Sequence, residues 1–308
     1  DLLDGKEIIR KSMTEELDRA VEALSRAREG RKVALISSGD AGVYGMAGPT
    51  FEVLLQAGWT PPAITLETDE AGHEQRIVGD GIEVEIIPGA SALNSCAALV
   101  GAPLTHDFCS ISLSDLLTPW PTIARRLDAA AQADFVVALY NPKSGRRTRQ
   151  IVEAQQLFLR HRAPTTPVAI VKSAYRRRQH IEFTTLDRMA EADIGMLSTV
   201  LIGNSNTFMQ HGLMITPRGY ANKYDVTGDR GVKGGERSGR SLSSGLNGWL
   251  QSLHADHAAG MSVADLAAQY RLPADYIQAS LDAPLPEPEV SKSRRKTPAA
   301  SGSPEGNA

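Results

Sequence analysis

Apolar and polar positions alternate along the chain with two different periods, which separate helices from strands. Over residues 6–29, apolar side chains recur every three or four positions among charged ones, which predicts an amphipathic helix that ends at Gly30. The apolar run at 32–37 predicts a buried strand. A glycine-rich bend follows and leads into a second predicted helix that ends near Ala57. The chain therefore begins with helix, strand, bend and helix in turn.

The same alternation continues to about residue 222. A strand is predicted at 82–87 and a helix of small residues, capped by Ser91, at 91–100, while residues 101–120 are predicted to form a connector. In the second half the pattern predicts two helices, at 123–131 and 144–160. It predicts four strands, at 135–140, 168–171, 181–184 and 199–202. Repeats of strand, glycine bend and helix are typical of an α/β fold with a mostly parallel sheet. Such folds bind ligands at the carboxyl ends of their strands.

Changes in composition divide the chain into five parts. We predict an N-terminal α/β domain at 1–115 and a C-terminal α/β domain at 116–222. Residues 223–245 are rich in glycine, serine and charge, which predicts a flexible linker. A small helical extension is predicted at 246–282 and a disordered tail at 283–308.

The helical extension has the pattern of a small helix–turn–helix unit, with SVADLAAQY followed by LPADYIQASL. The second of these segments carries no lysine or arginine, so DNA-groove recognition is disfavoured. A module that contacts another protein is the preferred interpretation, and an inert appendage is the alternative.

Composition restricts the class of protein. A chain of 308 residues with 42% hydrophobic content can bury one large core or two modest ones, and a net charge of -3 gives no global attraction to nucleic acid or anionic membranes. Cys96 and Cys109 lack metal-cluster spacing and fit a reducing cytosol. No apolar run approaches the roughly 18 residues of a membrane-spanning helix, and no signal peptide is visible. A cytoplasmic protein is expected.

The bend ISSGDAGVYGMAG, residues 36–48, is the first candidate for ligand binding. Its glycine spacing is neither GxGxxG nor a Walker loop, and the carboxylate of Asp40 would repel a phosphate. A carboxylate among glycines suits a ligand with ammonium, sulfonium or ribose groups. The alternative is a plain strand-to-helix turn in which Asp40 caps the helix.

The second candidate is a concentration of positive charge. Residues 143–178 contain ten lysines and arginines and a single acid, Glu153. Because arginine forks match carboxylates, this stretch predicts a polyanionic partner, either a nucleic acid or a small molecule with many carboxylates. A solvated basic face is the alternative. Hydrolase and metal sites are disfavoured, since the chain has no GxSxG motif and its seven histidines are scattered.

Four stretches, taken in order, carry a family resemblance: SSGDAGVYGMAG, IPGASALNSCAALVGAPLTHDFCSISLSDLLTPW, ALYNPKSGRR and TVLIGNSNT. Over residues 1–222 the chain resembles the tetrapyrrole methylases of cobalamin biosynthesis, and PLTHDFCSISLSDLLTPW resembles the branch that acts on carbon 17 of precorrin-3B. The resemblance implies two αβα domains with S-adenosylmethionine (SAM) in the cleft between them, and a homodimer. The implied reaction transfers the SAM methyl group to carbon 17 and contracts the macrocycle, giving precorrin-4.

The resemblance also implies roles for individual residues. Cofactor-lining residues, by position, are Gly39, Asp40, Gly42, Tyr44, Ser91, Ala92, Tyr140, Asn141, Ala174 and Gly203. The carboxylates of the tetrapyrrole are assigned to Lys143, Arg146, Arg147 and Arg176. Ring contraction moves protons, and the acid/base groups nominated for it are His106 and Asp107. No resident metal and no membrane or nucleic-acid partner is implied, and the absence of cysteine clusters favours a metal-free substrate.

The sequence departs from the family in one important respect. Members open with a strand and a GxGPGD-type loop that pack into the first sheet, and residues 1–308 contain no counterpart. We therefore expect a truncated chain that is unstable or aggregates when expressed alone, because loss of a buried strand exposes a sheet edge.

Two rival functions stay open. One is a sibling methylase that acts on another ring carbon, on RNA or on protein. The other is a nucleic-acid-binding protein that uses the basic stretch and the helical extension.

Overall fold

The computed structural model describes residues 3–12, 15–68, 74–79, 81–145, 147–226, 248–270 and 272–285. The chain divides into two compact units, residues 1–219 and 220–308. Among the described residues, no helix has the length and apolar character needed to cross a bilayer. The predicted linker and tail fall almost entirely outside the described residues.

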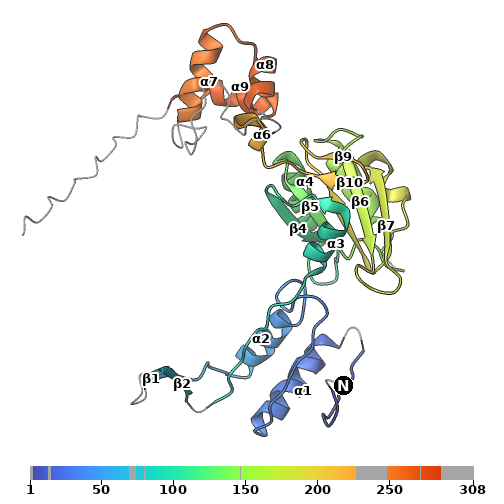
Figure 1. The fold of residues 1–308 in the computed structure, drawn as a ribbon, viewed down its shortest axis with the longest axis vertical. Helices are drawn as coiled ribbons and strands as arrows, with labels where there is room; N and C mark the ends of the chain where they lie inside the picture. The colour runs from blue at the N-terminus through green and yellow to red at the C-terminus, as the bar shows by residue number, and fades with distance from the viewer. Residues whose placement is uncertain are drawn as a thin grey trace, which may run out of the picture. The chain divides into compact units, whose positions relative to one another are not determined.

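A five-stranded sheet forms the centre of the first unit (Figure 1). Its strands, in spatial order, are β4 (Phe108–Ser112), β5 (Val136–Tyr140), β8 (Ser198–Ile202), β6 (Pro167–Lys172) and β7 (His180–Thr185). Only β4 and β5 are parallel; β8 runs antiparallel to both of its neighbours, and β6 and β7 form an antiparallel hairpin. The prediction of a mostly parallel sheet was therefore wrong, although the α/β class is correct.

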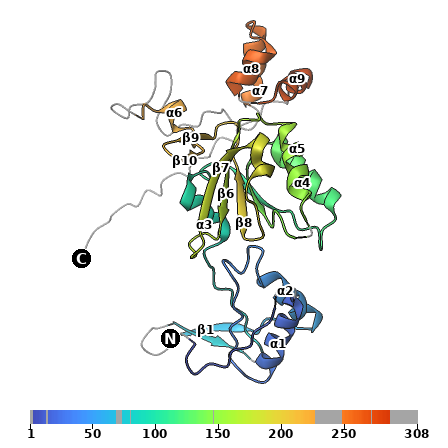
Figure 2. The same cartoon turned by 90° about the vertical axis from the view of Figure 1, so that its right-hand side faces the viewer.

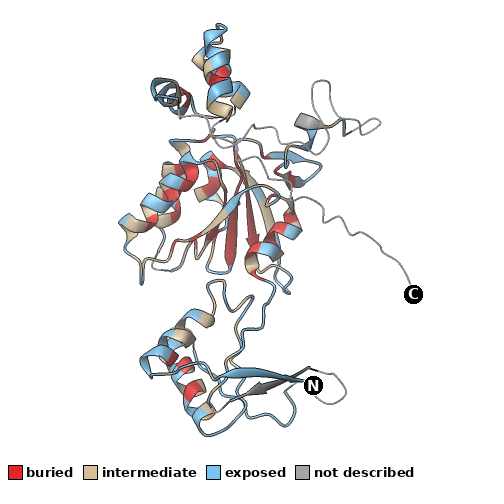
Figure 3. Cartoon of the chain, turned by 90° about the vertical axis from the view of Figure 1, so that its left-hand side faces the viewer, coloured by how far each residue is buried: buried red, intermediate tan, exposed pale blue. Residues whose placement is uncertain are grey.

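Helices cover both faces of this sheet (Figure 2). α4 (Trp120–Gln132), α5 (Gln150–Leu159) and the 3-10 helix η1 (Leu186–Glu191) pack on one face, and α3 (Ala92–Val100) packs on the other. The side chains of β5 alternate accordingly: Val137 and Leu139 join the first core and Ala138 joins the second. All five β5 residues except the last are buried, which is why the run reads as continuously apolar (Figure 3).

Most predicted elements of the second half are confirmed. The strands at 135–140, 168–171, 181–184 and 199–202 and the helices at 91–100 and 123–131 are present with shifts of one to three residues at their ends. α5 begins at Gln150, six residues later than predicted. The predicted connector contains β4, which the polar residues of FCSIS concealed. A small sheet of β3 (Gly101–Ala102), β10 (Leu213–Ile215) and β9 (Phe208–Gln210) was not predicted.

The N-terminal part contains fewer regular elements than predicted. α1 (Glu16–Arg28) occupies only the second half of the predicted first helix, and Gly30 follows it with φ +79°. α2 (Ala47–Gln56) ends where predicted, and β1 (Ile64–Thr68) pairs with β2 (Glu74–Val78) as an antiparallel hairpin.

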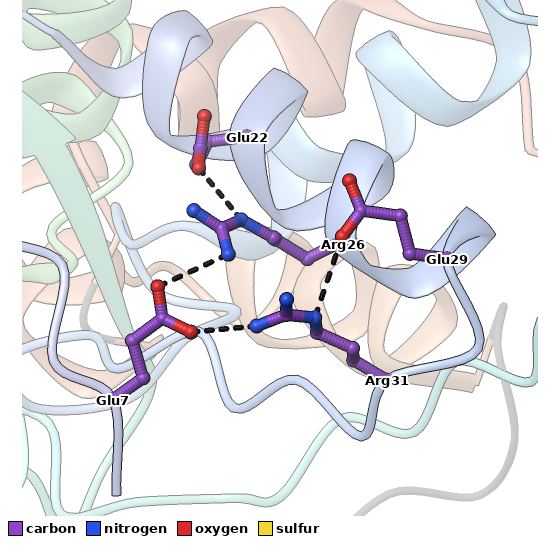
Figure 4. A network of polar contacts seen from close by, with 5 residues as sticks. All are labelled: Glu7, Glu22, Arg26, Glu29 and Arg31. Atoms are coloured by element: carbon purple, nitrogen blue, oxygen red, sulfur yellow. Dashed lines mark hydrogen bonds and ion pairs between the residues drawn. The ribbon is translucent and has the colours of Figure 1, made fainter.

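Residues 3–12 are not helical; ion pairs connect this segment to α1 (Figure 4). The Glu7 carboxylate lies 3.0 Å from Arg26 and 2.6 Å from Arg31, which themselves reach Glu22 and Glu29. All five side chains are at least a quarter exposed. Such pairs contribute about 0–1 kcal/mol each, so they orient the segment more than they stabilise it.

The strands predicted at 32–37 and 82–87 are not formed, although both segments are described. They instead line a groove of about 780 Å³ together with apolar residues of α1 and α2, including Leu24, Phe51 and Leu54. Ile36 and Ile87 are 71% and 67% exposed. A strand requires a hydrogen-bonded partner about 4.8 Å away, and none of the described residues pairs with either segment in a ladder. The prediction of strands at 32–37 and 82–87 was therefore wrong for the described residues, although both segments contribute apolar side chains to the groove.

A buried arginine joins elements at the amino edge of the sheet, where β4, β5 and β6 begin. Arg162 is 7% exposed and donates hydrogen bonds to the carbonyl oxygens of Ala130, Phe135 and Gly203. Its guanidinium lies 4.9 Å from the centre of the Phe158 ring. Burial lowers the pKa of Arg162 to about 10, so the side chain remains charged at neutral pH.

We expect Arg162→Lys to lower the free energy of unfolding by about 2–4 kcal/mol, because an ammonium cannot reach three carbonyl groups in one plane and leaves buried acceptors unpaired. The midpoint of urea denaturation measures the change. Arg160→Lys is the control, since Arg160 is exposed at the end of α5 and should shift stability by less than about 0.5 kcal/mol. Equal effects of the two substitutions would contradict the assignment.

Within the predicted helical extension, the described residues of the second unit form α7 (Gly248–Ala258), α8 (Val263–Tyr270) and α9 (Ala274–Asp282). α6 (Tyr220–Lys223) precedes them. One fully buried residue from each helix forms the centre of their common core: Leu253, Leu266 and Ile277. Burial and the neighbouring Asp256 raise the pKa of Tyr270 to about 12. The unit therefore has a core of its own.

Candidate functional site

The glycine bend is held against a second bend by the side chain of Asp40. One carboxylate oxygen accepts a hydrogen bond from the Gly42 amide at 2.7 Å, and the other accepts one from the Gly89 amide at 2.8 Å. These two bonds hold the pKa of Asp40 below its ordinary value near 3.8. Asp40 does not cap α2, whose first turn has no side-chain cap, so the capping role that the alternative interpretation gave to Asp40 was wrong.

The two bends are too close for side chains larger than glycine at key points. A Cβ atom at Gly89 would lie 2.2 Å from the carbonyl oxygen of Gly39, and one at Gly45 would lie 2.6 Å from the carbonyl oxygen of Asp40. Gly39 itself has φ +76°. Backbone therefore packs directly on backbone, which leaves peptide groups and one carboxylate as the groups available to a ligand.

Two tyrosines connect the bend to the central sheet. Tyr44 has a left-handed φ of 52° and its hydroxyl donates to the carbonyl of Ser110 in β4 at 3.1 Å. Its ring lies 4.7 Å from that of Tyr140, the last residue of β5. The Tyr140 hydroxyl accepts a hydrogen bond from the Leu93 amide in the first turn of α3. Burial raises the pKa of Tyr140, so it stays a neutral phenol near pH 7.

The start of α3 lies at the same place. Ser91 is buried and accepts a hydrogen bond from the Asn94 amide at 3.3 Å, which confirms the predicted cap. Ala92 follows as the first helical residue, and the next residue, Leu93, contacts Tyr140. Ser91 and Ala92 are thus brought together with Tyr140.

Asn141 follows β5 and has a left-handed φ of 49°. Its side-chain amide donates a hydrogen bond to the hydroxyl of Ser112 at the end of β4. Strained non-glycine residues of this kind concentrate at functional sites. Ser112 was not predicted as a site residue; the parallel pairing of β4 with β5, which places it opposite Tyr140, is the missing signal.

The basic residues differ in how far they are engaged. The Arg147 guanidinium donates to the Leu113 carbonyl at 2.9 Å and lies 3.9 Å from Asp115, so it anchors the chain after β4. Arg176 donates to the hydroxyl of Ser38, which lies within the glycine bend directly before Gly39, at 2.7 Å. Lys143 is partly buried, and Arg146 lies outside the described residues. Ala174 lies in the same loop as Arg176.

Three residues predicted to belong to the site, Gly203, His106 and Asp107, lie at the edge of the sheet opposite to Tyr140. Because β8 is antiparallel to β5 and β6, its last residue, Ile202, pairs with Val137 and Val168 near their beginnings. Gly203 follows there and its carbonyl is taken by Arg162. Its predicted cofactor role is therefore not supported by its position.

His106 and Asp107 precede β4, and the Asp107 carbonyl accepts from the Val136 amide at the start of β5. The imidazole Nδ1 accepts from the Asp107 amide at 2.8 Å. Asp107 lies five residues before Ser112, with β4 between them and a rise of about 3.3 Å for each residue. The structure thus does not bring the nominated acid/base pair to the Asp40–Tyr140–Asn141 cluster.

For the reaction that the sequence resemblance implies, we expect His106→Ala to change the rates of methyl transfer and ring contraction by no more than about twofold, because His106 lies at the opposite end of β4 from Ser112. Single-turnover kinetics followed by absorption and mass would measure both steps. Loss of ring contraction with methyl transfer intact would restore the acid/base assignment.

The family model described as tetrapyrrole (corrin/porphyrin) methylases matches residues 68–190. A probable cobalt-factor III C(17)-methyltransferase of Salmonella typhimurium is 44% identical over 215 residues, which cover 70% of this chain and 80% of that protein. The chain belongs to the tetrapyrrole methylase family.

Two further comparisons agree with membership of the tetrapyrrole methylases. A cobalt-factor III methyltransferase of Priestia megaterium is 58% identical over 225 residues; the match covers 73% of this chain but only 38% of that protein. The crystal structure of the methyltransferase CobJ superposes with a TM-score of 0.59 at 34% identity, covering 70% of this chain and 82% of that one. The chain therefore spans well under half of the Priestia protein and most of the Salmonella and CobJ chains.

Proposed function

We propose that this tetrapyrrole methylase transfers the methyl group of SAM to carbon 17 of a precorrin-3B-type tetrapyrrole and contracts the macrocycle. The names of the Priestia and Salmonella relatives support the substrate class, and the second name specifies carbon 17. The observation that carries the proposal is the Asp40 cluster, in which one carboxylate, two glycine bends and two tyrosines meet at the carboxyl ends of β4 and β5.

The residues present fit SAM. An ionised carboxylate has about four acceptor positions, and the Gly42 and Gly89 amides occupy two of those of Asp40, so acceptor capacity remains for an ammonium or ribose hydroxyl. Tyr44 is 52% exposed beside Tyr140, and aromatic faces attract cations such as a sulfonium. When bound, SAM supplies an electrophilic methyl group.

The chain's own contribution to methyl transfer is alignment. A direct displacement requires the acceptor carbon, the methyl carbon and the sulfur to lie in line, and correct positioning accounts for much of the acceleration in such reactions. Glycine contacts, the capped α3 and the Tyr140–Leu93 bond fix the walls of the site before a ligand arrives. The Arg147 and Arg176 contacts fix the loops beside it.

The metal state of the substrate has two supported versions. The sequence favours metal-free precorrin-3B, whereas the names of the Priestia and Salmonella relatives favour a cobalt-containing macrocycle. In the second version the cobalt is part of the substrate, as the names of these relatives indicate.

The test is incubation of the protein with SAM and, separately, precorrin-3B and cobalt-factor III. The proposal expects a mass gain of one methyl and a changed absorption spectrum with one of the two macrocycles. NMR of the product locates the new methyl group, and its position on a carbon other than 17 would favour a sibling methylase. Absence of any transfer, with saturable binding of S-adenosylhomocysteine retained, would contradict the proposed reaction.

A further inference from the structure

The turn between β6 and β7 is an unusually basic hairpin loop. Residues 173–179, read SAYRRRQ, connect Lys172 to His180, which pair directly across the two strands. We call these seven residues the arginine loop. Figures 1 and 2 show β6 and β7 side by side. The loop begins at the carboxyl end of β6. Because β8 runs antiparallel to both β5 and β6, this end lies at the same edge of the sheet as Tyr140, the last residue of β5.

Internal hydrogen bonds define the shape of the arginine loop. The Arg176 amide donates to the Ser173 carbonyl at 3.0 Å, and the Gln179 amide donates to the Arg176 carbonyl at 2.9 Å. The Gln179 side chain accepts from the Tyr175 amide at 2.8 Å. Ser173 and Tyr175 have left-handed φ values of 53° and 55°, each costing about 1–3 kcal/mol for a non-glycine residue. A fixed, strained loop carrying three like charges is not explained by packing alone.

The three arginines surround an open cavity but are not equivalent. Ser173, Arg176, Arg177 and Arg178 line a volume of about 550 Å³. Arg176 is bound to Ser38, whereas the exposed Arg177 and Arg178 have no hydrogen-bond or ion-pair partner among the described residues. Asp193, an acid near this edge, is paired with Lys172 at 2.9 Å. Two unpaired guanidinium groups therefore face water.

Resting on the proposed function, we infer that Arg177 and Arg178 bind peripheral carboxylates of the tetrapyrrole, while Arg176 acts as a positioning residue that joins this loop to the glycine bend. Each guanidinium can form a two-pronged hydrogen bond with one carboxylate, and the internal hydrogen bonds of the loop hold the backbone that carries both side chains. Arg176 is hydrogen-bonded to Ser38, and Ser38 directly precedes Gly39 and Asp40 in the sequence. This bond therefore joins the arginine loop to the part of the glycine bend that contains Asp40. Tyr175, 67% exposed on the same loop, offers an aromatic ring to a flat ligand.

The experiment measures binding separately from turnover. Uroporphyrin III, a macrocycle with eight carboxylates, serves as the probe in a fluorescence titration of the chain of residues 1–308, and coproporphyrin III, with four, serves as the comparison. We expect Arg177→Gln and Arg178→Gln each to weaken uroporphyrin binding about tenfold and the double variant about 30- to 100-fold. Weakening should be smaller for coproporphyrin. Arg188→Gln, which changes an exposed arginine of η1, should alter binding less than about twofold.

The outcomes distinguish this inference from the proposed reaction. Variants that bind uroporphyrin as tightly as the parent would overturn the inference even if methyl transfer proceeds. Arginine-dependent binding without methyl transfer to either macrocycle would leave the loop assignment standing and reject the reaction. In an active preparation, the expected signature is a raised KM for the tetrapyrrole with kcat and S-adenosylhomocysteine affinity unchanged. Tighter binding of a single-stranded RNA oligonucleotide than of uroporphyrin, with a steep salt dependence, would also overturn it.

Discussion

Asp40→Asn should weaken binding of S-adenosylhomocysteine by about 10- to 100-fold. The carboxylate uses one oxygen for the Gly42 amide and the other for the Gly89 amide. Asparagine has a single acceptor oxygen, so its NH2 group would face one of those N–H donors. The bends at Gly39 and Gly89 would separate, and the ligand would lose both the charge and the preformed walls. Isothermal titration calorimetry measures the change.

Glu52→Gln is the matched control, since it also converts a carboxylate to an amide on an exposed position of α2. Its affinity should stay within about twofold of the parent. Circular dichroism spectra of both variants should match the parent, because Asp40 joins loops and not the central core. Unchanged affinity in Asp40→Asn would remove Asp40 from the cofactor site.

The lowered pKa of Asp40 gives this contact a defined pH dependence. The group is held below its ordinary value near 3.8, so its contribution to the joined bends is fully present above that value and is lost as pH falls through the lower folded-state pKa. Affinity for S-adenosylhomocysteine attributable to Asp40 should therefore not vary between about pH 5 and 8.

The sequence allowed four of the five strands of the central sheet to be predicted, but neither β4 nor the directions of the strands. Ser198–Ile202 is buried at every position, and a fully buried strand has the same apolar pattern whichever way it runs. Direction depends on the connections: the arginine loop is short enough for a hairpin, and β8 then inserts between β5 and β6. Because β8 runs antiparallel to β5, Gly203 at its end lies at the edge where β5 begins and not at the edge of Tyr140. The sequence alone did not indicate the direction of β8, so it could not indicate on which edge Gly203 lies.

The candidate site was predictable where local chemistry is decisive. Glycines whose Cβ would meet backbone atoms, Ser91 as a cap and the carboxylate of Asp40 are visible as residue types in a short stretch. Ser38 and Ser112 were missed because their partners, Arg176 and Asn141, are distant in sequence. The division among the arginines was also hidden, since adjacent identical residues in YRRRQ differ only in which one reaches Ser38.

Hydrogen exchange should reveal a large difference in stability within the first unit. Amides of β5 and β8, which pair with each other inside two cores, should be protected at least about 1000-fold more strongly than amides at 31–37 and 81–87. The latter segments form no ladder and line the 780 Å³ groove, so opening them breaks few hydrogen bonds and exposes little new apolar surface. Mass spectrometry of peptic peptides measures both regions in one experiment.

Two substitutions test whether these regions open independently. Phe158→Ala removes a fully buried ring from the core beneath β5 and should cost about 3–5 kcal/mol, speeding exchange throughout the five strands. Leu35→Ser, in the wall of the groove, should leave the exchange of β5 and β8 unchanged. Two results would together contradict this expectation: protection of residues 31–37 equal to that of β5, and a single cooperative melting transition at high temperature. They would show that the exposed groove does not lower the stability of the chain and that the instability expected from the sequence is wrong. We expect the exposed apolar side chains of these segments, Ile36 and Ile87 among them, to limit the solubility of the chain, because exposed apolar surface favours association with other copies.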